Sequence, residues 1–348
     1  MPVLLWLAPS ALAALSAVSL VLGGAWTFLI PVIAFGLVPL VDQLYPGSAV
    51  NPDDDEQARR LRDGRYDLFL LLTTPFHLGL LALYLSGVAS GAWSGAALAG
   101  ATFTTGISCG VFGINVAHEL GHRQDRRYHL VAQVLLLSTL YLHFFIEHNR
   151  GHHRRVATPD DPASARRGET VYGFWARSVI GSWRSAWALE ADRLRNAGQS
   201  PWSWANQMLR FQVVQAAAAA GVLALGGPAA LAGWVAVSLV GVLLLETVNY
   251  LEHYGLERRR NERGVWERVR PQHSWNSNRP AGRLLLFDLT RHADHHANAT
   301  RPYAVLRHHD DAPELPAGYA AMVVMALVPP LFHRVMHRAL DSLPGAAA

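Results

Sequence analysis

Histidines gather in four short stretches of this chain, each at or just after the end of an apolar segment. The stretches read HELGH (118–122), EHNRGHH (147–153), NYLEHYGL (249–256) and RHADHH (291–296). In three of them two histidines stand four positions apart, a spacing that places both imidazoles on one face of a helix. The nine histidines concerned are His118, His122, His148, His152, His153, His253, His292, His295 and His296.

Neutral imidazole is a good ligand for zinc, copper and iron, so this pattern predicts a metal site. Nine ligands exceed what one four- to six-coordinate ion accepts, but they suit two ions. Four carboxylates stand beside the histidines and could accept the second ring N–H of a ligand, which fixes its tautomer. These four are Glu119, Glu147, Glu252 and Asp294. Charged residues near a membrane surface are also commonly just solvated.

The elements that must position these histidines are apolar enough to cross a membrane. Hydrophobic residues make up 51% of the chain and charged residues only 16%, against about 25% charged in soluble domains. A helix needs about 20 apolar residues to span a bilayer. The sequence predicts an all-α polytopic membrane protein, a single domain over 1–348, with a tight hairpin at 226–228. Its six expected transmembrane helices cover 3–22, 25–45, 68–86, 92–116, 211–226 and 229–249.

The distribution of arginine predicts the orientation of these helices. No lysine is present, and all thirty basic residues are arginine. Six spans place both termini on one side, and the turns on the other side (23–24, 87–91 and 226–228) carry no arginine. Because positively charged loops stay cytoplasmic, we expect both termini, the histidine-rich segments 117–210 and 250–348, and the di-metal site on the cytoplasmic face of the membrane. The absence of a basic region before residue 3 favours a first span over a cleaved signal peptide.

Two further apolar runs are expected not to cross the membrane. If residues 130–146 crossed, HELGH and EHNRGHH would lie on opposite faces and could not share a site. We therefore expect this run to be re-entrant, interfacial or packed against the bundle. The run 318–328 ends early at Pro329-Pro330, which predicts an interfacial or docking helix.

Composition excludes several kinds of chemistry. The single cysteine, Cys109, rules out disulfides, cysteine-ligated zinc and iron–sulfur clusters within the chain, and we expect a buried thiol. The absence of lysine removes Schiff-base chemistry. The net charge of +4 comes without a nucleic-acid-binding motif, so no nucleic-acid partner is expected. Of the other histidines, we expect His77 to be a satisfied buried group, His333 and His337 to lie at the surface, and His273 to support the site.

The histidine stretches resemble those of the integral-membrane alkane monooxygenases (alkane hydroxylases). These belong to the histidine-box superfamily that includes the membrane fatty-acid desaturases. The resemblance runs from about residue 40 to residue 310, and NYLEHYGL and HSWNSN favour the hydroxylase branch. The matching stretches are NVAHELGHR, EHNRGHHRRVATPDDPASAR, NYLEHYGL, PQHSWNSN and LTRHADHHANATRPYAVLRHHD.

The resemblance implies a six-helix bundle and a non-haem di-iron centre with the nine histidines as ligands. It implies O2-dependent hydroxylation of the terminal methyl group of an alkane to a primary alcohol. Electrons would come from rubredoxin, reduced by a flavin-dependent, NADH-using reductase; with one cysteine, this chain would need a separate rubredoxin. The apolar wall would hold the substrate with its end near the metals. Exposed arginines (Arg154, Arg155 and Arg258 to Arg260) could dock an acidic donor, although the orientation rule also explains them.

Three alternatives stay open. The first is another oxidation on this scaffold: desaturation, or hydroxylation of a fatty acid or a methyl-arene. The second is an intramembrane zinc protease, because HELGH matches H-E-x-x-H with Glu119 as the general base. The third is a non-catalytic metal-binding or transport protein. The sequence does not reveal the preferred chain length of the substrate, the oligomeric state, any bridging ligand or the division of nine histidines between two ions. Trp6, Trp26 and Trp93 are bulky candidates for limiting the cavity, although tryptophans at span ends usually anchor at the interface.

Overall fold

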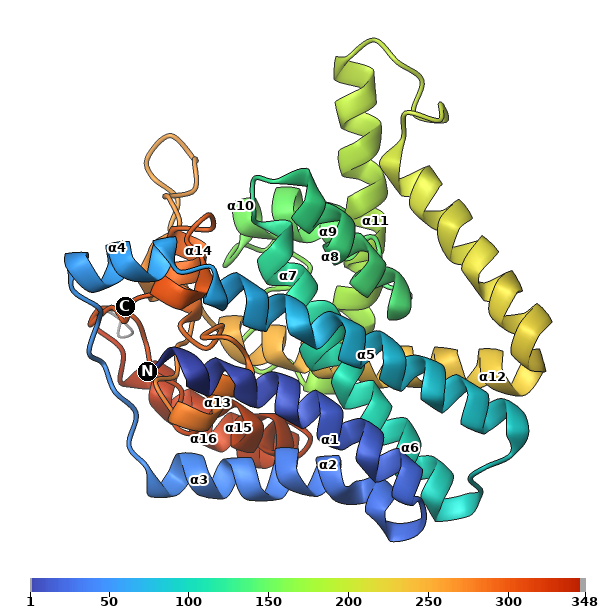
Figure 1. Ribbon diagram of the computed structural model, residues 1–348. Helices are drawn as coiled ribbons and strands as arrows, with labels where there is room; N and C mark the ends of the chain where they lie inside the picture. Colours follow the sequence, from blue (N-terminus) through green and yellow to red (C-terminus); the bar gives the residue numbers. More distant parts are fainter. Residues whose placement is uncertain (1, 345–348) are drawn as a thin grey trace.

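A computed structural model describes residues 2–344 and confirms the all-helical class (Figure 1). Within these residues the only β pairing consists of two isolated bridges, Arg260 with Trp266 and Asn276 with Glu314. The N-terminal half runs through η1 (Val3–Leu7), α1 (Ala8–Leu22), η2 (Gly24–Phe28), α2 (Leu29–Val32), η3 (Ile33–Leu37), α3 (Val38–Leu44), α4 (Asp54–Arg62), α5 (Arg65–Ser90), α6 (Gly95–Ser108), η4 (Cys109–Ile114) and α7 (Asn115–Gly121).

The rest of the chain carries the remaining histidines. Its elements are α8 (Arg126–Ser138), α9 (Phe144–Glu147), η5 (His148–His152), α10 (His153–Arg155), α11 (Val171–Asn196), α12 (Gln207–His253), η6 (Pro271–His273), α13 (Pro280–Leu285), α14 (His292–Ala297), η7 (Tyr303–Val305), α15 (Tyr319–Ala326) and α16 (Pro329–Asp341). The elements η3, η4 and η5 are π-helical, and the other η elements are 3₁₀ turns.

Five helical segments of the described chain are long and apolar enough to cross a membrane. They are Val3–Leu22, Gly24–Leu44, Arg65–Ser90, Gly95–Gly121 and Gln207–His253. The last is α12, whose 47 residues contain a non-helical residue, Gly227, with φ 73° and ψ −176°. Glycine adopts this left-handed φ without a steric penalty, and Pro228 cannot donate a backbone hydrogen bond across the break. The predicted spans 211–226 and 229–249 are therefore the two arms of α12.

The two arms of α12 diverge from Gly227 instead of forming the expected tight hairpin (Figure 1). We call residues 207–226 the first arm and 228–253 the second arm. The second arm packs closely on α6 and η4, because glycines replace side chains at the contact. A Cβ on Gly241 would lie 2.6 Å from the Cβ of Cys109, and one on Gly106 would lie 2.4 Å from Val240. Such small-residue contacts are typical of membrane helices.

The apolar run 130–146 does not form a span, as predicted. Helix α8 ends at Ser138, Leu140 has a positive φ of 54°, and a new short helix begins at Phe144. Leu135 and Leu136 are fully buried in the core, so one face of α8 packs against the bundle.

Two side chains that the sequence analysis expected to be buried, His77 and Cys109, are buried, and the C-terminal helices pack on the bundle. The His77 ring binds the Ser108 Oγ (2.9 Å) and the Ser138 Oγ (2.8 Å), which makes it the satisfied buried group expected. Cys109 is free and buried. The run 318–328 becomes α15, which docks on α12, and α16 follows directly after Val328. Helix α16 buries three residues at four-residue spacing, Phe332, Met336 and Leu340.

Candidate metal centre

The structure gathers all nine predicted histidines into two adjoining groups. Four segments supply them: α7 with the residue after it, η5 with α10, the end of α12, and α14. The group of five consists of His118, His122, His148, His153 and His295, and the group of four consists of His152, His253, His292 and His296. Within each group, the atoms that could bind a metal lie within 4.8 Å of one another.

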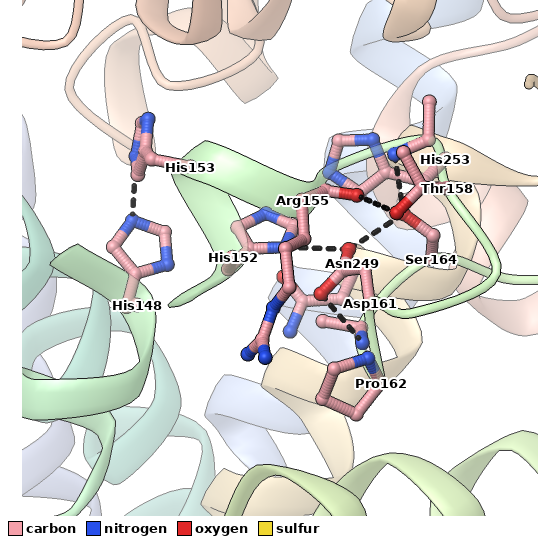
Figure 2. A network of polar contacts seen from close by, with 12 residues as sticks. His148, His152, His153, Arg155, Thr158, Asp161, Pro162, Ser164, Asn249 and His253 are labelled. Atoms are coloured by element: carbon pink, nitrogen blue, oxygen red, sulfur yellow. Dashed lines mark hydrogen bonds and ion pairs between the residues drawn. The ribbon is translucent and has the colours of Figure 1, made fainter. Parts of the chain in front are cut away.

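A π-helical turn decides which histidines share a group. In an α-helix His148 and His152 would face the same way, as the spacing predicted. Residues His148–His152 instead form η5, whose wider turn brings residues five apart onto one face. His148 therefore points toward His153, with their Nε2 atoms 3.0 Å apart, and His152 joins the other group. Figure 2 shows the resulting separation between the His148–His153 pair and His152.

Every histidine of the two groups directs its Nε2 atom at the Nε2 atom of another. In the group of five, His118 and His295 are 2.8 Å apart and His122 and His148 are 3.2 Å apart. In the group of four, the distance is 3.2 Å both for His152 with His296 and for His253 with His292. Several nitrogen lone pairs thus converge on two points, an arrangement that a bound cation stabilises.

Burial favours the unprotonated form of these imidazoles, which is the form that binds a metal. Desolvation holds the pKa of His148, His153 and His295 well below the usual value, and neighbouring imidazoles add to the effect. Desolvation likewise lowers the pKa of His122 to about 3. The donor set therefore fits metal ions, because burial favours neutral nitrogen atoms in both groups.

Asp161 performs the role that the sequence assigned to other carboxylates. Its Oδ2 atom lies 2.9 Å from the His152 Nδ1 and accepts a hydrogen bond of 2.6 Å from the Ser164 hydroxyl (Figure 2). Burial disfavours a charged His152, but the charge and hydrogen bond of Asp161, together with the charges of two nearby glutamates, outweigh it and raise the pKa of His152. Asp161 lies in VATPDDPASAR (156–166), shortly after the second histidine stretch. This closeness in sequence to His152 is the signal that could have identified it.

The four predicted carboxylates have other partners. Glu252 contacts one of the nine imidazoles directly, with its Oε2 3.2 Å from the His292 Nε2, and its Oε1 accepts from the Tyr319 hydroxyl at 2.9 Å. The structure shows no hydrogen bond between the other three and the nine rings. Glu119 binds Arg123 and the Tyr303 amide, Glu147 binds Arg155 and Ser185, and Asp294 binds Arg301, His309 and the Arg307 amide. These three carboxylates instead connect the segments that surround the histidines.

The remaining predicted residues are also placed. Arg258 is buried and donates to the backbone of Glu267 and Arg154, and Arg155 is engaged by Glu147, so neither is a free surface cation. His333 and His337 are half-buried rather than free at the surface: His333 bonds the Glu169 carbonyl and His337 the Tyr254 hydroxyl. His273 bonds the Arg270 amide and Glu267.

An apolar cavity lies in the bundle beside the histidines. It comprises about 830 Å³ of space between atoms, including its open side. Aliphatic and aromatic side chains from α1, η3, η4, α12 and α15 line it, among them Phe35, Val111 and Leu244. Two polar residues of the lining mark the end near the site: Asn115, three residues before His118, and Tyr319, which holds Glu252.

None of the three predicted tryptophans lines this cavity. Trp6 is buried against Phe287 and Tyr303. Trp93 stacks on Tyr84, and Trp26 is exposed. The cavity is bounded instead by smaller side chains, which the sequence pattern did not single out.

Comparison with known proteins places the chain in a family. Residues 91–326 match the fatty acid desaturase family. The chain is 41% identical to alkane 1-monooxygenase 1 of Pseudomonas aeruginosa, over 89% of this chain and 82% of that protein. It is 39% identical to the alkane 1-monooxygenase of Acinetobacter baylyi, over 88% and 75%. The hydroxylase component of the xylene/toluene monooxygenase of Pseudomonas putida is 29% identical, over 89% and 81%. The chain therefore belongs to the alkane 1-monooxygenase family, within the fatty acid desaturase family.

Proposed function

We propose that this protein is a membrane monooxygenase that uses O2 to hydroxylate the terminal methyl group of n-alkanes, giving primary alcohols. The observation that carries the proposal is the apolar cavity next to two groups of five and four imidazoles. Both relatives of highest identity named above are alkane 1-monooxygenases. The lining is largely aliphatic, and an alkane has no group that forms hydrogen bonds. An alkane would therefore bind in the cavity by burying its apolar surface.

The proposed cofactor is a pair of non-haem iron ions, one held by the five-histidine group and one by the four-histidine group. Iron at these positions would supply the activation of O2 that side chains cannot provide. The protein's own residues bind and orient. Asp161 fixes the ring of His152, Tyr319 holds Glu252 against His292, and the cavity walls exclude water from the substrate.

The proposed electron donor is a separate rubredoxin, reduced by a flavin-dependent, NADH-using reductase. Arg154, Arg259 and Arg260 remain exposed and could contact an acidic donor. We further propose that the protein lies in a bacterial inner membrane, with both termini and the histidine groups on the cytoplasmic side. The arginine-free turns support this orientation.

A direct assay tests the proposed reaction. Membranes containing the protein receive rubredoxin, its reductase, NADH, octane and isotopically labelled O2. The expected product is 1-octanol carrying the label. In parallel, p-xylene tests the second candidate, methyl-arene hydroxylation, which the similarity to the xylene/toluene monooxygenase component favours. Labelled product from p-xylene but not from octane, with iron loading confirmed, would contradict the alkane proposal.

Metal content tests the ligand assignment separately from activity. His295→Ala removes a nitrogen from the group of five, and His152→Ala removes one from the group of four. Each variant is expected to lose turnover and about one of two bound irons per chain, because ligand removal weakens its own ion most. His337→Ala, which removes a ring that bonds the Tyr254 hydroxyl and belongs to neither group, is the control and should keep both irons. Zinc in place of iron in the wild-type protein would reopen the protease alternative.

A further inference from the structure

A groove with one cationic end and one apolar end runs between α8 and the first arm of α12. It consists of two adjoining hollows that share four lining residues, among them Leu130 and Arg210. The first hollow adds Arg126 and His129. The second adds only apolar side chains, including Val134 and Leu137 of α8 and Val214 of the first arm.

The polarity changes in the same direction along both walls. On α8, Arg126 in the first turn is followed by Leu130, Val134 and Leu137, at spacings that keep them on one helical face. On α12, Arg210 in the first turn is followed by Phe211 and Val214. From Arg126 to Leu137 the wall extends over roughly 16 Å at 1.5 Å per residue, which is long enough for a polar headgroup and part of an acyl chain.

The two arginines of the groove lack acidic partners in the described structure. Neighbouring arginines are paired: Arg123 with Asp67, Arg127 with Asp125, and Arg150 with Glu190. No salt bridge involves Arg126 or Arg210, and no carboxylate of a described residue lines either hollow. Two free guanidiniums at the mouth of an apolar groove are complementary to a phosphate attached to a hydrocarbon chain.

We propose that this groove binds one anionic glycerophospholipid, with its phosphate between Arg126 and Arg210 and one acyl chain along Val134, Leu137 and Val214. The lipid would fill the space between α8 and the first arm of α12. It would also contact Phe145, which lines the cationic end and lies three residues before His148. The proposal rests on the membrane location of the protein and is independent of its substrate.

The headgroup is tested by native mass spectrometry of the full chain released from micelles that contain phosphatidylglycerol or phosphatidylcholine. The wild type is expected to retain one phosphatidylglycerol in preference to phosphatidylcholine. The double variant Arg126→Gln/Arg210→Gln should lower this retention at least about tenfold. Arg127→Gln, which removes an arginine of the same helix that lies outside the groove, should not lower it. Equal retention in the double variant and the wild type would overturn the proposal.

The acyl chain is tested by filling the groove. Val214 and Val213 are each 45% exposed, but only Val214 lines the groove. Val214→Trp is expected to lower retention of phosphatidylglycerol, while Val213→Trp leaves it unchanged, with equal melting temperatures confirming that both variants fold. Loss of retention in the arginine variant without loss in Val214→Trp would mean phosphate binding alone and would overturn the lipid assignment.

Discussion

At the scale of single residues, the orientation of His152 depends on a carboxylate nine residues away. Asp161 is fully buried and accepts from the outer nitrogen of His152 and from Ser164. We expect Asp161→Asn to reduce iron bound at the group of four and to lower activity by about 10- to 100-fold, as is usual for partners of metal-binding histidines. Metal analysis and the octane assay measure this effect. Asp160→Asn changes an exposed neighbour and should leave both values unchanged.

Val111 offers a test of the cavity as the substrate site. It lines the cavity one helical turn before Asn115, away from the histidines. Val111→Phe adds bulk there and should shift the preference of the enzyme toward shorter alkanes. The ratio of kcat/KM for dodecane to that for octane should fall by about tenfold or more, as expected for mismatches in apolar pockets. Val235→Phe, at a half-exposed position outside the cavity, is the control; an equal shift there would contradict the cavity assignment.

At the scale of the elements, close packing of the second arm of α12 on η4 positions α7, because η4 leads directly into the helix that carries His118. A larger side chain at Gly241 would collide with Cys109 and the Gly110 backbone. We expect Gly241→Leu to lower the melting temperature by several degrees, as overpacking does, and to reduce bound iron. Gly221→Leu, on the first arm, where an added Cβ would have no neighbouring atom within 4 Å, should change neither.

Glu190 joins three elements and makes their association depend on pH. Its carboxylate accepts hydrogen bonds from Arg150 (2.7 Å), Arg193 (2.9 Å) and the Gln207 amide (2.7 Å), connecting η5, α11 and α12. Burial opposes the charge, but hydrogen bonds from Arg193, Gln207 and Arg150 outweigh it and lower the pKa of Glu190 to about 2, from 4.5. Because the folded-state pKa is depressed, the stabilisation is complete above pH 4.5 and is lost as the pH falls toward 2.

The corresponding prediction concerns Glu190→Gln. This variant should melt about 4 °C or more below the wild type at pH 7, and the difference should narrow between pH 5 and pH 3. Thermal unfolding of the purified protein at several pH values measures it. Asp192→Asn removes an exposed carboxylate paired with Arg195 on the same helix and should show no such difference. A difference in melting temperature between Glu190→Gln and the wild type that stays constant with pH would contradict the role of the Glu190 charge.

At the scale of the whole molecule, the proposed orientation can be tested with single cysteines. Native Cys109 is buried and should not react with a membrane-impermeant maleimide. In spheroplasts, Ser90→Cys at the α5–α6 turn should be labelled, because the arginine-free turns are expected outside the cytoplasm. Arg263→Cys, in the loop after α12, should be labelled only after lysis. Labelling of Arg263→Cys in intact spheroplasts would contradict the proposed orientation and indicate the opposite one.

Local sequence determined the helical class, the apolar segments and the identity of the nine histidines. These features follow from residue type and from spacing within one or two turns, which act wherever the chain lies. The same local reasoning identified Cys109 and His77 as buried groups. Setting the run 130–146 apart from the spans required the further premise that HELGH and EHNRGHH share one site.

Tertiary structure alone decided how the site is assembled. The division into five and four depends on the π-helical turn at His148–His152 and on contacts between residues such as His118 and His295, far apart in the chain. The partnership of His152 with Asp161, the burial of Arg258 and the lining of the cavity likewise arise from packing between separate elements. Spacing along the chain specifies which side chains share a helical face, but which faces meet depends on how the helices pack, and that is a property of the folded molecule.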